Sequence, residues 1–389
     1  MQTARQVRNL PSLTGLRFAA MLPVFLVHVA LEGVFSADSA NWGFLNGLGT
    51  SGYVAVSSFF VLSGFVITWS FDQRDTLRGF YRRRLARVLP NHVVVFGIAL
   101  VLMAAFRMAV GLPNALAQLL LVQAWIPDYS YLDFGNSVSW SLSVDVVFYG
   151  LFPAIILVAR KIRPRHLWYW AGVAVLGVVL VSTVAMFLLP AEPVRPLGEI
   201  SESQYWLIHF LPVSRLFECL LGVVMARIVQ NGQWIGLRPL WAFALLLAAY
   251  AITFLVPYPY RLTSVTVAPL GLLIASLAVA DVEGRRTLLS YRFLVRLGEL
   301  SYAFYLLHNL VVRFGHLAFG GEEVDGETVG RTWSTPVALA LIVAAFALSL
   351  GAAWLLHTFV EKPAVRRWSK AGPRPPAEPA VAPAGATAS

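Results

Sequence analysis

The chain has 389 residues, of which 58% are hydrophobic and only 13% are charged, and its formal net charge is +10. A soluble globular domain is usually about a quarter charged, so this composition excludes one and is typical of an integral membrane protein. The positive charge therefore indicates basic cytoplasmic loops rather than a nucleic-acid partner. The single cysteine, Cys219, excludes an internal disulfide and a metal site built from several thiolates.

Apolar runs along the chain predict an all-α fold, a polytopic bundle of about ten transmembrane helices. In chain order the expected spans are 13–34, 52–71, 91–110, 138–159, 168–189, 206–229, 240–256, 264–280, 297–317 and 335–359. The seventh and eighth spans are short. The apolar piece 115–126 is expected to be a re-entrant or interfacial segment.

Arginine and lysine gather in alternate connections, such as 72–90 and 160–167, whereas acidic residues dominate the connections between them. Short cytoplasmic loops accumulate basic residues, so we expect both termini in the cytoplasm and a multi-pass protein of the cytoplasmic membrane. Residues 1–370 are expected to form one transmembrane domain. Residues 371–389 are rich in proline and alanine, and we expect a disordered cytoplasmic tail there.

The first span, "LRFAAMLPVFLVH" at 16–28, carries two ionisable side chains, Arg17 and His28. Eleven residues are close to three helical turns, so both project from one face, about 16 Å apart along the axis. With the expected topology, Arg17 lies near the inner surface and His28 near the midplane. Ionisable groups at that depth usually face the bundle interior. The alternative is a neutral histidine that is hydrogen-bonded to a neighbouring helix.

Other spans carry polar side chains at helical spacing. Ser141, Asp145 and Tyr149 follow one another at four-residue intervals, and His308 shares a helix face with Tyr302 and Tyr305. Arg215 and Glu218 are spaced to form an ion pair within one helix. A histidine beside a carboxylate is the usual arrangement of a general base, which favours a catalytic centre. Interhelical hydrogen bonds and an internal salt bridge are the structural alternatives.

Arginines crowd the segment "RRRLARVLP" that leads into the third span. Arg82, Arg83, Arg84 and Arg87 on a short juxtamembrane helix are suited to binding phosphates through two hydrogen bonds each. Anionic lipid is the competing partner, and cytoplasmic charge bias alone accounts for the number of arginines. Zinc-binding and nucleotide-binding motifs are absent from the sequence, so no metal site is predicted.

Taken in order, these segments resemble the acyltransferase-3 family of membrane O-acyltransferases, which includes O-antigen and exopolysaccharide acetylases and macrolide acyltransferases. The resemblance covers about 11–368. It depends on the motifs "LTGLRFAAMLPVFLVH", "FFVLSGFVIT", "RRRLARVLP", "SWSLSVDVVFY", "RLFECLLG", "LGELSYAFYLLH" and "EKPAVRR".

The resemblance implies transfer of an acetyl or other short acyl group from acyl-CoA to a hydroxyl. The acceptor would be a cell-surface glycan or a glycosylated small molecule such as a macrolide. No cofactor is permanently bound, and acetyl-CoA or propionyl-CoA is a co-substrate. His28 is then the catalytic base and Arg17 its companion. Asp145, which stands where relatives usually have Glu, is the third candidate catalytic residue, and Asp145 or Tyr305 would orient the imidazole. The arginines are candidates for the coenzyme A phosphates, and the candidate substrate-binding residues are Tyr149, Tyr302, Tyr305, His308, Arg215 and Glu218.

A proton-coupled secondary transporter is the rival interpretation, because the same intramembrane groups would serve as a proton relay. Transporters of that kind usually show paired repeats with interrupted helices. Inspection of the sequence shows neither. The absence of repeats favours the acyltransferase interpretation.

Overall fold

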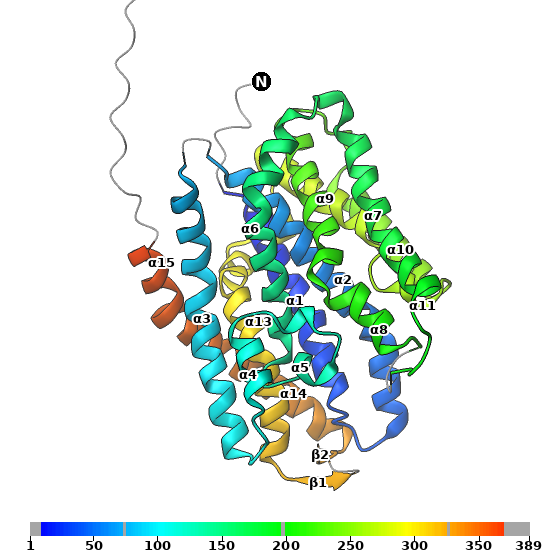
Figure 1. The fold of residues 1–389 in the computed structure, drawn as a ribbon, viewed down its shortest axis with the longest axis vertical. Helices are drawn as coiled ribbons and strands as arrows, with labels where there is room; N and C mark the ends of the chain where they lie inside the picture. Colours follow the sequence, from blue (N-terminus) through cyan, green and yellow to red (C-terminus); the bar gives the residue numbers. More distant parts are fainter. Residues whose placement is uncertain (1–8, 73–74, 196–198, 325–326, 369–389) are drawn as a thin grey trace, which may run out of the picture.

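The computed structural model describes residues 9–72, 75–195, 199–324 and 327–368, and these fold into a helical bundle with one β-hairpin (Figure 1). The longer helices are α1 (Pro11–Leu31), α2 (Asp38–Ser70), α3 (Leu77–Ala105), α6 (Trp140–Lys161), α7 (Leu167–Leu188), α9 (Pro212–Gln230), α10 (Pro239–Thr253), α12 (Val267–Val282), α13 (Arg292–Ala318) and α14 (Thr335–Leu356). The shorter elements are α4 (Leu112–Leu119), α5 (Tyr129–Leu132), α8 (Glu202–Tyr205), α11 (Tyr258–Arg261), α15 (Lys362–Trp368), β1 (Gly321–Val324) and β2 (Glu327–Gly330). Two π-helical turns cover Trp206–Phe210 and His357–Glu361.

Each expected span coincides with one of the longer helices, and apart from the β-hairpin the described fold is helical, with the long apolar helices of a membrane protein. In the described part of the chain, seven helical stretches are long and apolar enough to cross a membrane, while α10 and α12 are apolar but shorter. The number of crossings and the side of each terminus stay predictions. The expected tail, 371–389, lies outside the described residues.

Two helices begin earlier than expected: α2 at Asp38 instead of 52, and α3 at Leu77 instead of 91. An apolar run marks only the stretch that suits hydrocarbon, whereas a helix continues wherever its backbone hydrogen bonds continue. Pro90 lies inside α3 rather than at its start. Proline removes one backbone donor, and long membrane helices tolerate that loss because neighbouring groups satisfy the freed carbonyl.

The arginine-rich connections lie at one end of the bundle. Figure 1 shows the start of α1, the end of α2, the start of α3 and the α6–α7 connection together at that end, with strands β1 and β2 at the other. Asp281, at the end of α12, accepts hydrogen bonds from the backbone N–H and hydroxyl of Ser12, at 2.9 and 2.6 Å. The α12–α13 connection is therefore anchored to the same end as the start of α1. We call this end the basic end.

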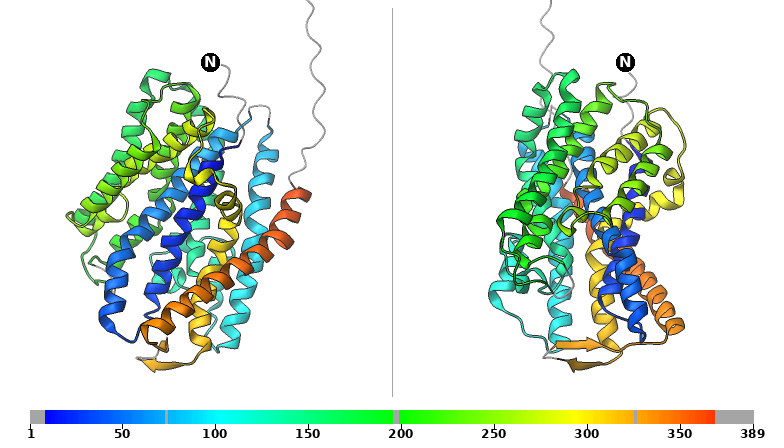
Figure 2. Two further views of the ribbon diagram at one scale, coloured as in Figure 1. Left: turned by 180° about the vertical axis from the view of Figure 1, so that it is seen from behind. Right: turned by 90° about the vertical axis from the view of Figure 1, so that its right-hand side faces the viewer.

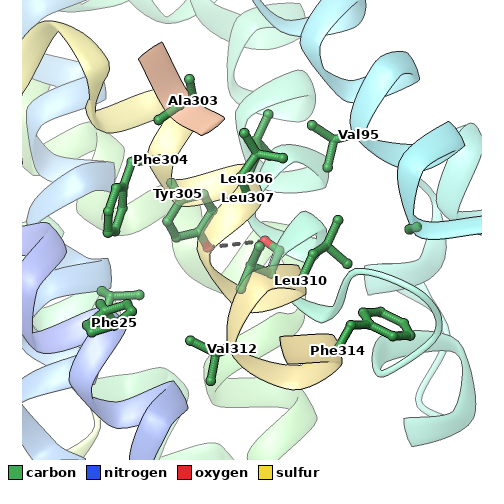
Figure 3. Packing of buried hydrophobic residues seen from close by; sticks show 14 of the residues in the cluster. Phe25, Val95, Ala303, Phe304, Tyr305, Leu306, Leu307, Leu310, Val312 and Phe314 are labelled. Atoms are coloured by element: carbon green, nitrogen blue, oxygen red, sulfur yellow. Dashed lines mark hydrogen bonds between the residues drawn. The ribbon is translucent and has the colours of Figure 1, made fainter. Parts of the chain in front are cut away.

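Helices α1 and α2 join the two halves of the bundle. One buried apolar cluster includes side chains from α1, α3, α13 and α14, and a second includes side chains from α2, α7, α9, α10 and α12. Figure 2 shows α14 running obliquely across α13, with which it packs. The first cluster is drawn in Figure 3, where Phe25 of α1 and Phe304 of α13 lie between their two helices. The candidate site lies where these helix groups meet.

Two glycines bring α2 and α9 into backbone contact. A Cβ atom on Gly64 would overlap the carbonyl of Cys219, and one on Gly222 would overlap the carbonyl of Val61. Small residues allow such close approach between membrane helices, where van der Waals packing replaces the hydrophobic effect as the driving force. The close contact fixes the position of Ser63, one residue before Gly64.

Candidate active site

A cavity of about 770 Å³ opens at the basic end. Its walls come from α1, α2, α3, α6, α13 and the π-helical turn His357–Glu361. Along α2 the lining extends from Ser70 to Val56, about 21 Å of helix. Ligand sites typically measure 300–1,000 Å³, so the cavity has room for an elongated small molecule.

Three cationic side chains line the cavity, together with the carboxyl groups of Asp145, Glu299 and Glu361. Arg17 comes from α1, Arg87 from α3 and Lys362 from the start of α15. Among the described residues, Arg17 has neither a hydrogen bond nor an ion pair, although Asp145, Tyr149 and Arg87 act on it electrostatically. An arginine with its donors unused in a cavity wall is available to an anionic ligand.

Asp145 and Tyr149 lie on the wall formed by α6, together with Ser141, as the four-residue spacing predicts. The hydroxyl of Ser63 donates to Asp145 Oδ1 at 3.3 Å. The Asp145 side chain therefore faces α2 and Arg17. Of the hydrogen bonds described in the structure, none joins Asp145 to His28.

A carboxylate–histidine pair lies in the part of the cavity wall formed by the π-helical turn. His357 Nδ1 is 2.9 Å from Glu361 Oε2, and Asn91 donates to the same oxygen at 3.4 Å. His357, Glu361 and Lys362 all line the cavity. A π-helical turn often marks a functional site, because it rotates side chains relative to a regular helix. The sequence analysis missed His357 and Glu361; the signal available was a histidine four residues before the glutamate of "EKPAVRR".

Aromatic side chains form the deep end of the cavity. Tyr302 and Tyr305 of α13 line it together with Phe59 of α2. The Tyr305 hydroxyl donates to the carbonyl of Val138 at 3.1 Å (dashed line in Figure 3), and the Tyr302 hydroxyl donates to the carbonyl of Val88 at 3.3 Å. Both rings are thus held by backbone atoms of neighbouring segments.

His28 lies beyond this aromatic layer and is not part of the cavity lining. Its Nδ1 atom is 3.3 Å from Nε2 of His308, whose side chain is completely buried. The His308 ring centroid is 5.8 Å from that of Tyr305, which does line the cavity. His28 therefore faces the bundle interior, as expected from its depth, and one aromatic ring connects its partner to the cavity wall.

The four arginines that lead into the third span differ in their surroundings. Arg87 lines the cavity. Arg83 instead forms an ion pair with Asp75, with 3.0 Å between Nη1 and Oδ1. Arg84 donates to Ser70 at 3.4 Å and lies over the Phe80 ring. Arg82 is exposed.

Arg215 and Glu218 form the expected ion pair, with 3.1 Å between Nη2 and Oε2. Both residues are 1% exposed, and Arg215 also donates to Ser57 at 3.3 Å. Neither residue lines the cavity. The pair therefore lies within the contact between α2 and α9, where it joins the two helices.

Together, the fold and the site define a polytopic membrane protein with an interior cavity, a cationic mouth and a histidine pair beyond its deep end. Residues 10–358 match the acyltransferase domain family, and the chain belongs to that family. It is 41% identical over 370 residues to acyltransferase MdmB of Streptomyces mycarofaciens, an alignment that covers 93% of each chain. It is 26% identical over 344 residues to the peptidoglycan O-acetyltransferase OatA of Listeria monocytogenes, covering 80% of this chain and 51% of that relative. No solved structure matches the chain.

Proposed function

We propose that the protein transfers an acetyl or other short acyl group from acyl-CoA to a hydroxyl group of a sugar or a glycosylated small molecule such as a macrolide. The observation that carries the proposal is the cavity, which runs from a cationic mouth to the aromatic layer beside the histidine pair. The protein lies in the cytoplasmic membrane with its basic end facing the cytoplasm, the compartment that supplies coenzyme A thioesters.

The anionic half of the donor belongs at the mouth. Arg17, Arg87 and Lys362 supply the positive charge that coenzyme A phosphates require, and arginine binds phosphate oxygens through two parallel hydrogen bonds. The extended pantetheine arm then follows the cavity along α2. The thioester arrives at Tyr305 and Phe59, the side chains that line its deep end.

His28 is the general base of the reaction. Because His28 does not line the cavity in this structure, the reaction requires the Tyr305 ring to move aside. The His28 imidazole then removes the proton from the acceptor hydroxyl as the oxygen attacks the thioester carbonyl. The tetrahedral intermediate collapses, the carbon–sulfur bond breaks, and the thiolate takes the proton from the imidazolium to leave as coenzyme A. General-base assistance of this kind typically contributes ~100- to 10,000-fold in rate.

Asp145 takes a different role from His28. Its carboxylate accepts from Ser63 and attracts Arg17 across the cavity. Its charge therefore favours the charged guanidinium of Arg17 in the cavity wall, although no hydrogen bond joins the two side chains in the part of the chain that this structure describes. The buried layer of Phe59 and Tyr305 keeps bulk water from the thioester and so limits hydrolysis.

The test is transfer by the purified protein in lipid nanodiscs. Radiolabelled acetyl-CoA is incubated with a panel of glycan and macrolide acceptors, and labelled ester is measured. His28→Ala should lose at least ~100-fold in kcat, whereas His166→Ala, at an exposed histidine, should keep wild-type activity. Full activity of the His28 variant would refute the base assignment. Transport of an acceptor without labelled product would favour the transporter.

A further inference from the structure

The contact between His28 and His308 determines where the protons of both rings lie. His308 Nδ1 is 2.8 Å from the carbonyl oxygen of Tyr305 and 3.2 Å from that of Phe304. A carbonyl oxygen only accepts hydrogen bonds, so Nδ1 of His308 must carry the hydrogen. In the neutral ring Nε2 is then bare, and this is the atom that faces His28.

The same reasoning applies to His28. Its Nδ1 lies 2.8 Å from the carbonyl of Val24, one turn earlier in α1, so this nitrogen also carries a hydrogen. That N–H is shared between the Val24 carbonyl and the bare Nε2 of His308, at 3.3 Å. The remaining nitrogen of His28, Nε2, is left with its lone pair. A general base needs a free lone pair.

His308 is well suited to fix the orientation of His28, because the surrounding aromatic side chains fix its own ring. It lies parallel to the Phe304 ring at a centroid distance of 5.8 Å with an interplanar angle of 4°. Phe25 and Tyr305 contact it at 6.4 and 5.8 Å, and its side chain is 0% exposed. The His28 ring meets it nearly edge-on, with an interplanar angle of 83° and 4.9 Å between centroids.

We infer that His308 is the positioning residue of the catalytic base: its bare Nε2 accepts from His28 Nδ1–H and keeps the lone pair of His28 Nε2 available for the acceptor hydroxyl. The inference rests on the proposed function. Many hydrolases give this task to a carboxylate. Here a neutral imidazole performs it, and the carboxylate of Asp145 stays with Ser63 at the cavity wall.

The contact also acts after the proton has moved. Once Nε2 of His28 has taken the hydroxyl proton, the imidazolium still donates through Nδ1 to a neutral acceptor. A hydrogen bond from a charged donor is about twice as strong as a neutral one, so the contact stabilises the charged ring more than the neutral ring. His308 cannot become protonated at Nε2 at the same time, because two N–H groups would then point at each other.

Two substitutions separate this role from simple packing. His308→Gln keeps an acceptor at the distance of Nε2, whereas His308→Asn keeps a donor near the Tyr305 carbonyl but cannot reach His28. We expect kcat to fall on the order of 100-fold in His308→Asn and less than about tenfold in His308→Gln. The KM for acetyl-CoA should not change in either variant, because His308 does not line the cavity. Equal losses in both variants, or kcat retained in His308→Asn, would overturn the inference.

Nitrogen NMR tests the tautomer without reference to activity. The protein has seven histidines, and with ¹⁵N-labelled histidine the His28 signals are identified by their loss in His28→Ala. We expect Nδ1 protonated and Nε2 bare in the wild type. In His308→Asn the Val24 carbonyl still holds the hydrogen on Nδ1, and we expect the Nδ1 resonance of His28 to shift because that N–H loses its hydrogen bond to His308. A wild-type ring protonated at Nε2, or an unchanged His28 Nδ1 resonance in His308→Asn, contradicts the inference. Absence of labelled ester with the wild type would instead refute only the proposed function, since the NMR result does not depend on catalysis.

Discussion

Replacing Arg87 by glutamine removes one positive charge from the cavity mouth and keeps a polar side chain there. If Arg87 binds a phosphate of coenzyme A, the KM for acetyl-CoA rises. Hydrogen bonds to charged groups contribute about 1.5–3 kcal/mol. Arg87 is exposed, so water screens part of that energy, and we expect a loss near 1.4 kcal/mol, about a tenfold increase in KM.

The assay compares two donors. Acetyl-CoA carries phosphates and acetyl-pantetheine carries none, so Arg87→Gln should raise the KM of the first and leave that of the second unchanged. Arg83→Gln is the matched control, one turn earlier on α3, because Arg83 pairs with Asp75 and does not line the cavity.

Two results would refute this reasoning. An equal change in KM for both donors in Arg87→Gln would show that the arginine does not bind phosphate. An effect that appears only in nanodiscs made with anionic lipid would assign Arg87 to the membrane surface instead, the alternative that the sequence leaves open.

Two further predictions concern packing and acyl length. Gly222→Ala should lower the free energy of unfolding by about 1–3 kcal/mol, because the added Cβ meets the Val61 carbonyl. Gly150→Ala is the control, since open space surrounds Gly150 and the free energy of unfolding should not fall. Thermal denaturation in detergent measures both variants. Tyr305→Ala enlarges the deep end of the cavity and should raise the kcat/KM ratio of butyryl-CoA to acetyl-CoA by about tenfold, since each buried methylene contributes ~0.8 kcal/mol. Tyr302→Phe keeps the ring and should leave that ratio unchanged, and no change in Tyr305→Ala would place the acyl group elsewhere.

Much of the fold could be predicted, because hydrophobic runs and the distribution of charge are local properties of the sequence. The ten expected spans coincide with helices, and the spacing of Ser141, Asp145 and Tyr149 correctly predicts a shared face. The starts of α2 and α3 were missed because polar helical extensions carry no apolar signal. The hairpin of β1 and β2 was missed for a similar reason: its short strands lack the apolar alternation of a buried sheet.

Contacts between distant segments could not be predicted. His28 and His308 are 280 residues apart in the chain, and their contact depends on how α1 packs against α13. Asp145 was expected beside the base, but its partner is Ser63, which the contact between α2 and α9 holds in place. Arg83 and Arg87 lie one turn apart on α3 but have different surroundings, because Arg83 forms an ion pair with Asp75 whereas Arg87 lines the cavity.

The uninterrupted length of α3 has a mechanical consequence. Its 29 residues measure about 44 Å, roughly 14 Å more than a hydrocarbon layer of ~30 Å. The arginines of its first three turns therefore lie on a rigid helical extension beyond the hydrocarbon layer, not on a flexible loop. Adding one residue between Arg87 and Pro90 would rotate every arginine before the insertion by about 100° around the helix axis. Arg87 would then point away from the cavity mouth.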